Sequence, residues 1–262
     1  MTFDPRYAIV TASDSGIGKA TAVALAEAGM DIGITWHSDA AGAEATADEV
    51  RSHGRKAIIK QFDYTDLPSC AVSIDLLIED LGGLDVFVNN AGTGDSQMLV
   101  DTSYDEWRKI IATNLDGTFV CMRQAAKHMV KTGNGGRLIA VTSVHEHQPR
   151  VGSGPYDAAK HGIGGLIKTF ALELGQHNIT ANAVAPGEIA TPMTGQEDEA
   201  AESGAARYPA RSTRRCSRNR RCDCISCEPA GRLRDRCIVG RRRRDAADGA
   251  AGWLAFDQQR LA

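Results

Sequence analysis

Short apolar and β-branched runs alternate with longer amphipathic stretches through the first part of the chain. Short apolar runs bounded by turn residues are typical of buried strands, whereas apolar positions recurring at i, i+3 and i+4 are typical of helices. We predict six strands, at residues 7–11, 31–36, 56–61, 84–89, 136–143 and 180–184. Helices are predicted at residues 18–28, 40–53, 66–81, 104–131 and 156–174. This alternation predicts an α/β fold, with a Rossmann-type doubly wound parallel sheet in a three-layer domain.

The regular pattern stops near residue 205, where the composition also changes. The whole chain has a net charge of −3, but residues 207–244 alone contain fourteen arginines, no lysine and three acidic residues. Five of the seven cysteines, Cys216, Cys222, Cys224, Cys227 and Cys237, lie in the same stretch. We therefore predict a catalytic domain over residues 1–204 and an atypical, disordered Arg- and Cys-rich segment over residues 205–262.

Two chemical interpretations of this segment are weak. Cys222, Cys224 and Cys227 have neither a second cysteine pair at the usual spacing nor a nearby histidine, so we expect no metal site. Clustered arginines neutralise phosphates, but without lysines or interleaved aromatic residues nucleic acid is not the partner that we favour. At the other end, residues 1–7 do not resemble a secretion signal, and no apolar run is long enough to span a membrane. We expect a cytoplasmic protein with no membrane partner.

A glycine-containing loop follows the first predicted strand. Residues 11–18 read TASDSGIG and lead directly into a helix. Glycines at such a turn let the backbone approach a pyrophosphate, whose charge is met by free N–H groups and by the helix dipole. Taken alone, a plain tight turn is an equally good interpretation.

A second motif combines Tyr156, Lys160 and Ser143. Tyr156 and Lys160 are four residues apart on a predicted helix and so share a face, and Ser143 ends a strand thirteen residues before the tyrosine. Lowering a tyrosine pKa from about 10 by roughly 3 units takes about 4 kcal/mol of preferential stabilisation of the phenolate. A neighbouring ammonium acts in that direction. The Tyr-x-x-x-Lys spacing alone often arises by chance.

Together with the Asn-Asn-Ala-Gly turn at residues 89–92, these motifs resemble the short-chain dehydrogenase/reductase family. The loop matches its TGxxxGxG fingerprint, with Ala12 replacing the first glycine. The resemblance implies hydride transfer between a nicotinamide cofactor and a carbonyl or alcohol substrate. It makes Tyr156 the general acid or base, Ser143 the group that polarises the carbonyl oxygen, and Lys160 a ligand of the nicotinamide ribose. Asn114 would support a proton-relay water or, alternatively, only serve as a helix-kink amide.

The same resemblance implies a set of cofactor contacts along the C-terminal ends of the strands. Besides Tyr156 and Lys160, they are Thr11, Ser13, Ser15, Gly16, Ile17, Gly18, His37, Ser38, Asp63, Asn90, Ala91, Gly92, Pro186, Gly187, Ile189 and Thr191.

The end of the second strand bears on the choice between NADP and NAD. NAD-binding Rossmann proteins place a carboxylate there, about 20 residues past the loop, to bind the ribose 2′-hydroxyl. Here His37 and Ser38 can instead donate hydrogen bonds to a 2′-phosphate, which favours NADP over NAD. Asp39 lies close by and weighs against this choice, and His37 and Ser38 are alternatively only solvated loop residues.

The substrate is less well indicated. Residues 143–147, Ser-Val-His-Glu-His, resemble the glucose dehydrogenase branch of the family more than the fatty-acid reductase branch. They either line the substrate pocket or are ordinary loop residues, so we infer no sugar substrate. Family members are commonly homo-oligomers.

A shifted reading frame explains the C-terminal segment. If the arginine codons are CGN, reading across codon boundaries turns Arg-Arg into Val, Ala, Asp or Gly. Residues 209–228 and 240–248 then permit strings that contain GRPGD and VDGG, which resemble the family's C-terminal part. We favour this interpretation, with the frame changing within residues 197–206. The last helix and seventh strand of the family would then be missing, which puts the homo-oligomer in doubt. The alternatives are a catalytically impaired nucleotide-binding protein and a protein with a basic, nucleic-acid-binding tail.

Overall fold

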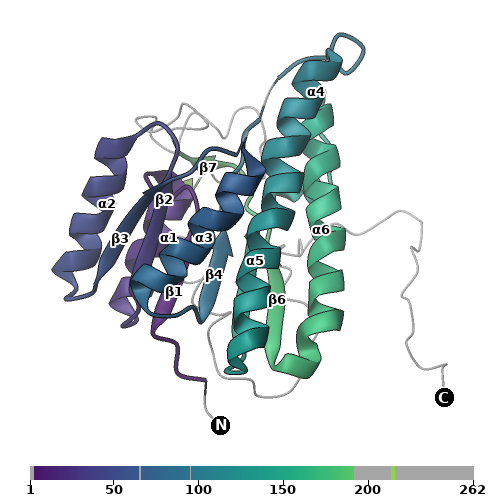
Figure 1. Cartoon of the computed structure of the whole chain (residues 1–262). Helices are drawn as coiled ribbons and strands as arrows, with labels where there is room; N and C mark the ends of the chain where they lie inside the picture. Colours follow the sequence, from purple (N-terminus) through teal and green to yellow (C-terminus); the bar gives the residue numbers. More distant parts are fainter. Residues whose placement is uncertain (1–2, 65, 95, 192–213, 216–262) are drawn as a thin grey trace, which may run out of the picture.

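The computed structural model of the chain describes residues 3–64, 66–94, 96–191 and 214–215. Its centre is a six-stranded parallel sheet with the order β3-β2-β1-β4-β5-β6 (Figure 1). The strands are β1 (Tyr7–Val10), β2 (Asp31–Trp36), β3 (Ala57–Gln61), β4 (Val86–Asn89), β5 (Gly136–Val141) and β6 (Ile179–Val184). This is the doubly wound Rossmann sheet that the sequence predicts, because the strand order reverses direction between β1 and β4.

Helices cover both faces of the sheet. They are α1 (Gly16–Glu27), α2 (Ala40–Ser52), α3 (Leu67–Leu81), α4 (Tyr104–Ile111), α5 (Gly117–Thr132) and α6 (Gly154–Leu174), with 3₁₀ turns η2 (Val144–Glu146) and η3 (Gly175–His177). Successive strand residues point to opposite faces. Ala8 and Val10 accordingly pack with residues of α1 and α2, whereas Ile9 packs with residues of α3, α5 and α6. Burial on both faces explains the almost unbroken apolar character of these strands.

The structure departs from the sequence-based prediction at two places. The single helix predicted over residues 104–131 is interrupted by a π-helical turn, η1 (Ala112–Asp116), between α4 and α5. A short strand β7 (Ile189–Ala190) also pairs in parallel with β8 (Arg214–Arg215), and neither was predicted. Two-residue strands are too short to show a hydrophobic period. The remaining residues of the 205–262 segment, including all five of its cysteines, lie outside the described residues.

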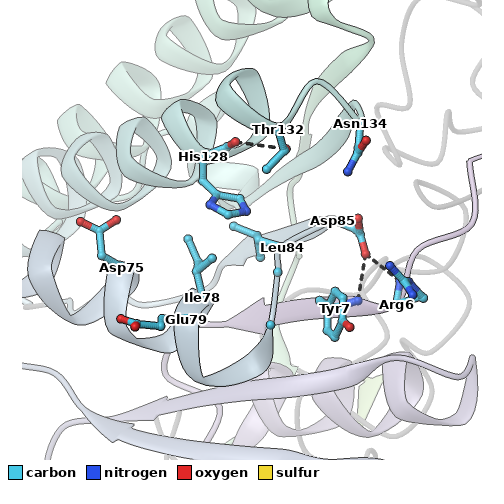
Figure 2. A pocket seen from close by; sticks show the side chains of 12 residues that line it. Arg6, Tyr7, Asp75, Ile78, Glu79, Leu84, Asp85, His128, Thr132 and Asn134 are labelled. Atoms are coloured by element: carbon cyan, nitrogen blue, oxygen red, sulfur yellow. Dashed lines mark hydrogen bonds between the residues drawn. The ribbon is translucent and has the colours of Figure 1, made fainter.

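The sheet has two ends that differ in character. The predicted catalytic residues follow the C-terminal strand ends, where doubly wound sheets bind ligands. A cavity of about 430 Å³ lies at the opposite end, lined by residues next to β1, α3, β4 and α5 such as Tyr7, Leu84 and His128 (Figure 2). There the Asp85 carboxylate accepts hydrogen bonds from the backbone N–H groups of Arg6 and Tyr7. This cavity is therefore remote from the predicted chemistry.

Within the described residues, β6 pairs only with β5 and so forms one edge of the sheet. None of the helices in this part of the chain is both long and apolar enough to cross a membrane.

Candidate active site

The loop after β1 is held in an unusual conformation. Ala12, which replaces the fingerprint glycine, has φ +47°, and Gly16 has φ +56°. The Ala12 N–H donates to Thr35 Oγ1 at 3.0 Å, and its carbonyl accepts a hydrogen bond from Asn90 Nδ2 at 2.9 Å. A Cβ at Gly18 would overlap with this same carbonyl, so only glycine lets α1 approach the loop this closely.

The first turn of α1 keeps its N–H groups available. Ser15 is the N-cap residue, but its side chain makes no capping hydrogen bond. The N–H groups of the first turn of a helix have no partner within the helix, and they suit an anion such as a pyrophosphate. Ser15, Gly16, Ile17 and Gly18 thus lie together at a place that fits the phosphates of a dinucleotide.

Thr11 and Ser13 have structural partners instead. Thr11 Oγ1 accepts hydrogen bonds from the N–H groups of Asn90 and Ala91, both at 3.0 Å. Ser13 Oγ donates to the carbonyl of Val10 at 2.8 Å. The two side chains therefore join the glycine loop to β1 and to the Asn-Asn-Ala-Gly turn after β4.

The proposed adenosine end lies after β2 and β3. His37 and Ser38 are exposed, and His37 Nε2 lies 3.9 Å from Asp63 Oδ1. Asp39 accepts a hydrogen bond from the Gly42 N–H and caps α2. Its carboxylate is therefore directed to the helix N-terminus. Burial raises the pKa of Asp14, and the nearby charge of Asp39 acts in the same direction.

Ser143, Tyr156 and Lys160 come together at the end of β5. Ser143 is buried and begins η2, while the other two residues lie one turn apart on α6. Lys160 Nζ donates to the Val141 carbonyl at 3.0 Å and lies 5.3 Å from the centre of the Tyr156 ring. This is the arrangement predicted from the Tyr-x-x-x-Lys spacing.

The electrostatics of this group differ from the sequence-based expectation. Burial raises the pKa of Tyr156, although its hydrogen bond with the Ser143 side chain acts in the opposite direction. Burial also lowers the pKa of Lys160 to about 8, so its charge is only partly maintained above neutral pH. The phenol is thus not pre-ionised by the protein alone, because removal from water disfavours both charged groups.

Asn114 lies in the π turn η1 and is fully buried. Its Nδ2 donates to the carbonyls of Thr93 at 2.8 Å and Ile110 at 2.9 Å, and its Oδ1 accepts from the Thr93 N–H at 3.2 Å. Both amide hydrogens are therefore used within the protein. The side chain fixes the loop after β4 to the helix kink.

Gly92 lies where the turn after β4 comes close to η1 and α6. A Cβ at this position would lie 2.7 Å from Asn114 Oδ1 and 3.5 Å from Lys160 Nζ. The turn after β4, η1 and α6 thus meet at one point. The segment containing Pro186 and Gly187 also reaches the site, since the Val144 N–H donates to the Pro186 carbonyl at 3.0 Å. Beyond it, Ile189 and Thr191 are buried.

Comparison with known proteins agrees with this geometry. The family model described as short chain dehydrogenase matches residues 6–202. The chain belongs to the short-chain dehydrogenase/reductase family. The match ends at residue 202, close to the change of composition. The chain is thus an enzyme of the oxidoreductase class, from a family that uses NAD(P).

Individual members of the family are also similar over most of the chain. An uncharacterized oxidoreductase, YohF, of Escherichia coli strain K12 is 55% identical over 74% of this chain and 76% of its own length. Glucose 1-dehydrogenase 2 of Bacillus subtilis is 36% identical over 71% of this chain and 72% of its own. The crystal structure of acetoin dehydrogenase YohF from Salmonella typhimurium has 46% identity and a TM-score of 0.80, covering 87% of this chain and 89% of that one.

Three residues beside the catalytic group had no specific role in the sequence analysis. The His145 ring lies edge-on to Tyr156, with ring centres 6.1 Å apart, and His145 Nδ1 is 3.7 Å from the buried Asp157 Oδ1. Glu146 is buried against α6. The sequence placed His145 and Glu146 only in a run after a strand, because no spacing rule says which face of a short 3₁₀ turn will be covered.

Proposed function

We propose that this chain is an NAD(P)-dependent oxidoreductase in which Tyr156 is the general acid for carbonyl reduction and the general base for alcohol oxidation. The assembly of Tyr156, Ser143 and Lys160 at the C-terminal end of β5 carries the proposal. The glycine loop and the Asn-Asn-Ala-Gly turn lie at the same end of the sheet, joined through Thr11. The proposed proton donor and the proposed cofactor residues therefore lie at the same end of the sheet.

A bound reduced nicotinamide would supply the hydride. The chain's own residues fit such a cofactor. Uncapped N–H groups at the start of α1 suit its phosphates, and Lys160 lies beside Gly92, where the nicotinamide ribose is proposed to bind. The proposed contacts further include Pro186, Gly187, Ile189 and Thr191 along the nicotinamide, and His37, Ser38 and Asp63 at the adenosine.

The protein residues have distinct tasks in the proposed reaction. In carbonyl reduction, the Tyr156 hydroxyl donates its proton to the carbonyl oxygen, which Ser143 polarises through a hydrogen bond. Charged Lys160 stabilises the phenolate that remains. Asn114 holds the loop and helix kink in place and supports a water that returns the proton.

We propose small α-hydroxyketones or vicinal diketones as the substrate class. Support comes from the acetoin dehydrogenase of Salmonella typhimurium, whose structure is similar over 87% of this chain. The glucose dehydrogenase relative is less similar, at 36% identity. Acetoin and diacetyl are therefore the first compounds to test, with glucose as the comparison.

NADP is the cofactor that we propose. The support is the exposed His37 and Ser38 at the end of β2, and Asp39 turned to the cap of α2. We expect kcat/KM to be at least about tenfold higher with NADPH than with NADH, because a paired phosphate contact is worth on the order of 1.4 kcal/mol. His37→Asp should reverse the preference, and equal kcat/KM values in the parent would argue against NADP.

The central experiment measures oxidation of the reduced cofactor by diacetyl with the full chain. Tyr156→Phe should lower turnover by about 10²–10⁴-fold, because a general acid is lost, while cofactor binding measured by fluorescence titration is retained. Tyr104→Phe, at an exposed tyrosine on α4, is the matched control. Full activity of Tyr156→Phe would disprove the assignment. Cofactor binding without turnover in the parent would indicate the impaired nucleotide-binding protein. Cell fractionation tests the proposed cytoplasmic location.

A further inference from the structure

Glu146 is a buried acidic residue next to the catalytic group, and the proposed reaction does not use it. It ends η2, the turn that begins at Ser143, and its N–H donates to the Ser143 carbonyl at 2.8 Å. The residue is only 9% exposed. Acidic side chains are almost never buried to this extent unless they are paired. A partner for this carboxylate is therefore expected.

The carboxylate packs against α6 at Gly164. A Cβ at Gly164 would overlap with Glu146 Oε1, so only glycine leaves space for the acid at this point. Gly164 lies four residues after Lys160 on the same helix and therefore on the same face. The fold thus brings the acid to the side of α6 that carries the catalytic lysine.

We propose that Glu146 is a positioning residue for the reaction, whose carboxylate is the counter-charge that keeps the buried Lys160 ammonium protonated. The inference rests on the proposed function, since it gives Lys160 its importance.

The surroundings of Lys160 support this role. Tyr156, on the same helix, lies beside Lys160 Nζ, which donates to the neutral Val141 carbonyl. Glu146, on η2, meets α6 one turn further along, at Gly164. Burial lowers the pKa of Lys160 to about 8, and the charge of Glu146 acts against this lowering. The second neighbour of the acid, His147 Nε2, lies 3.9 Å from Glu146 Oε1 on an exposed side chain.

The carboxylate of Glu146 affects which groups of the site are protonated at a given pH. Without the carboxylate, Lys160 would lose its proton at a lower pH, and the Tyr156 phenolate would lose its stabilising charge. A nearby opposite charge typically changes a pKa by 1–3 units, and we expect a change of about one unit here.

The first test is the pH dependence of diacetyl reduction. In Glu146→Gln, the alkaline limb of kcat should move down by about one pH unit, which makes turnover above that limb about tenfold lower. Glu146→Asp keeps the charge and should retain the parental limb even if it is less stable. Glu173→Gln, which removes an exposed charge from the end of α6, is the matched control. It should change neither the position of the alkaline limb nor the turnover above it.

A double-mutant cycle separates this role from a merely structural one. If Glu146 acts through Lys160, Glu146→Gln should cause no further loss of kcat in a Lys160→Met background. Equal, additive losses in both backgrounds would overturn the proposal.

A direct titration makes the test independent of turnover. In a chain labelled with ¹³C at lysine Cε, the Lys160 signal is the one absent from Lys160→Met. It should titrate near the parental pH in Glu146→Asp and about one unit lower in Glu146→Gln. Unchanged titration in Glu146→Gln would overturn the inference. If the parent shows no turnover but Lys160 titrates at a lower pH in Glu146→Gln than in the parent, the inference would be supported and the proposed function contradicted.

Discussion

Ala12 has a backbone conformation that alanine seldom adopts. Its φ of +47° places it in the left-handed region, which costs a residue with a Cβ about 1–2 kcal/mol. The hydrogen bonds to Thr35 and Asn90 hold it there. The strain lies in the loop where the dinucleotide is proposed to bind, as is common for functional loops.

Replacing Ala12 by glycine should therefore stabilise the protein. We expect Ala12→Gly to raise the free energy of unfolding by about 1 kcal/mol, and Gly16→Ala, at φ +56°, to lower it by at least as much. Urea unfolding curves measure both. Gly165→Ala, in open space on α6, is the control and should stabilise by about 0.5–1 kcal/mol through helix propensity. A destabilised Ala12→Gly variant would show that the alanine methyl group makes a favourable contact.

Lys160 should destabilise the fold that it serves. Its pKa is lowered from 10.5 to about 8 on folding, so the unfolded chain holds the proton more tightly. The penalty is complete below pH 8 and disappears as pH rises towards 10.5. We expect Lys160→Met to have a strongly reduced but measurable kcat and to be more stable than the parent below pH 8. The gain should be at most about 3 kcal/mol, reduced by the hydrogen bond that the Val141 carbonyl loses.

Chemical unfolding at several pH values checks this expectation. The stability difference between Lys160→Met and the parent should shrink between pH 8 and 10.5. A constant difference over that range would mean that burial of the charge is not its cause.

At the scale of elements, the π turn η1 is the departure from prediction that matters most for the site. One continuous helical pattern covers residues 104–131, yet the structure inserts a wider turn where Asn114 lies. The amide of Asn114 bonds to both backbone groups of Thr93 and to the carbonyl of Ile110. Such π turns often lie at functional sites.

Asn114→Ala should accordingly loosen the join between η1 and the loop after β4. We expect it to cost about 2–3 kcal/mol of stability, because buried N–H and C=O groups lose their partners, and to lower kcat more than it raises KM. Thermal melts and steady-state kinetics measure the two effects. Asn134→Ala, at an exposed residue by the remote cavity, is the control. A stability loss with unchanged kcat would leave Asn114 a structural residue only.

The sequence predicted most of the fold because strand and helix carry different periods. All six sheet strands and the face shared by Tyr156 and Lys160 follow from spacing alone. The role of Glu146 does not, because it depends on the space that Gly164 leaves on a helix eighteen residues later in the chain. The raised pKa of Tyr156 was also missed, since spacing reports neighbours but not burial.

At the scale of the whole molecule, the chain combines a family domain with a segment of foreign composition. We propose residues 1–204 as the catalytic domain and residues 205–262 as the product of a shifted frame. The family match ends at residue 202, and within the described residues the sheet stops at β6. An unpaired strand edge is a template for aggregation.

Restoring the frame should repair this edge. We expect a version translated through the GRPGD and VDGG coding sequences to show a higher melting temperature and to form a homo-oligomer in size-exclusion chromatography. The present chain should be less stable and should associate irregularly. Sequencing of the coding DNA across codons 195–210 is the first check. An uninterrupted frame without that coding potential would remove the proposal.

The edge at β6 also affects how strongly the amount of folded protein in the cell depends on the cofactor concentration. A ligand that binds only the folded state adds about 2.7 kcal/mol of stability at a concentration 100 times its Kd. If the sheet of the described residues gains no further strand, such a contribution would be a large part of the total free energy of unfolding. The amount of intact protein would then follow the size of the cofactor pool, because depletion of that pool would raise the unfolded fraction that proteases degrade.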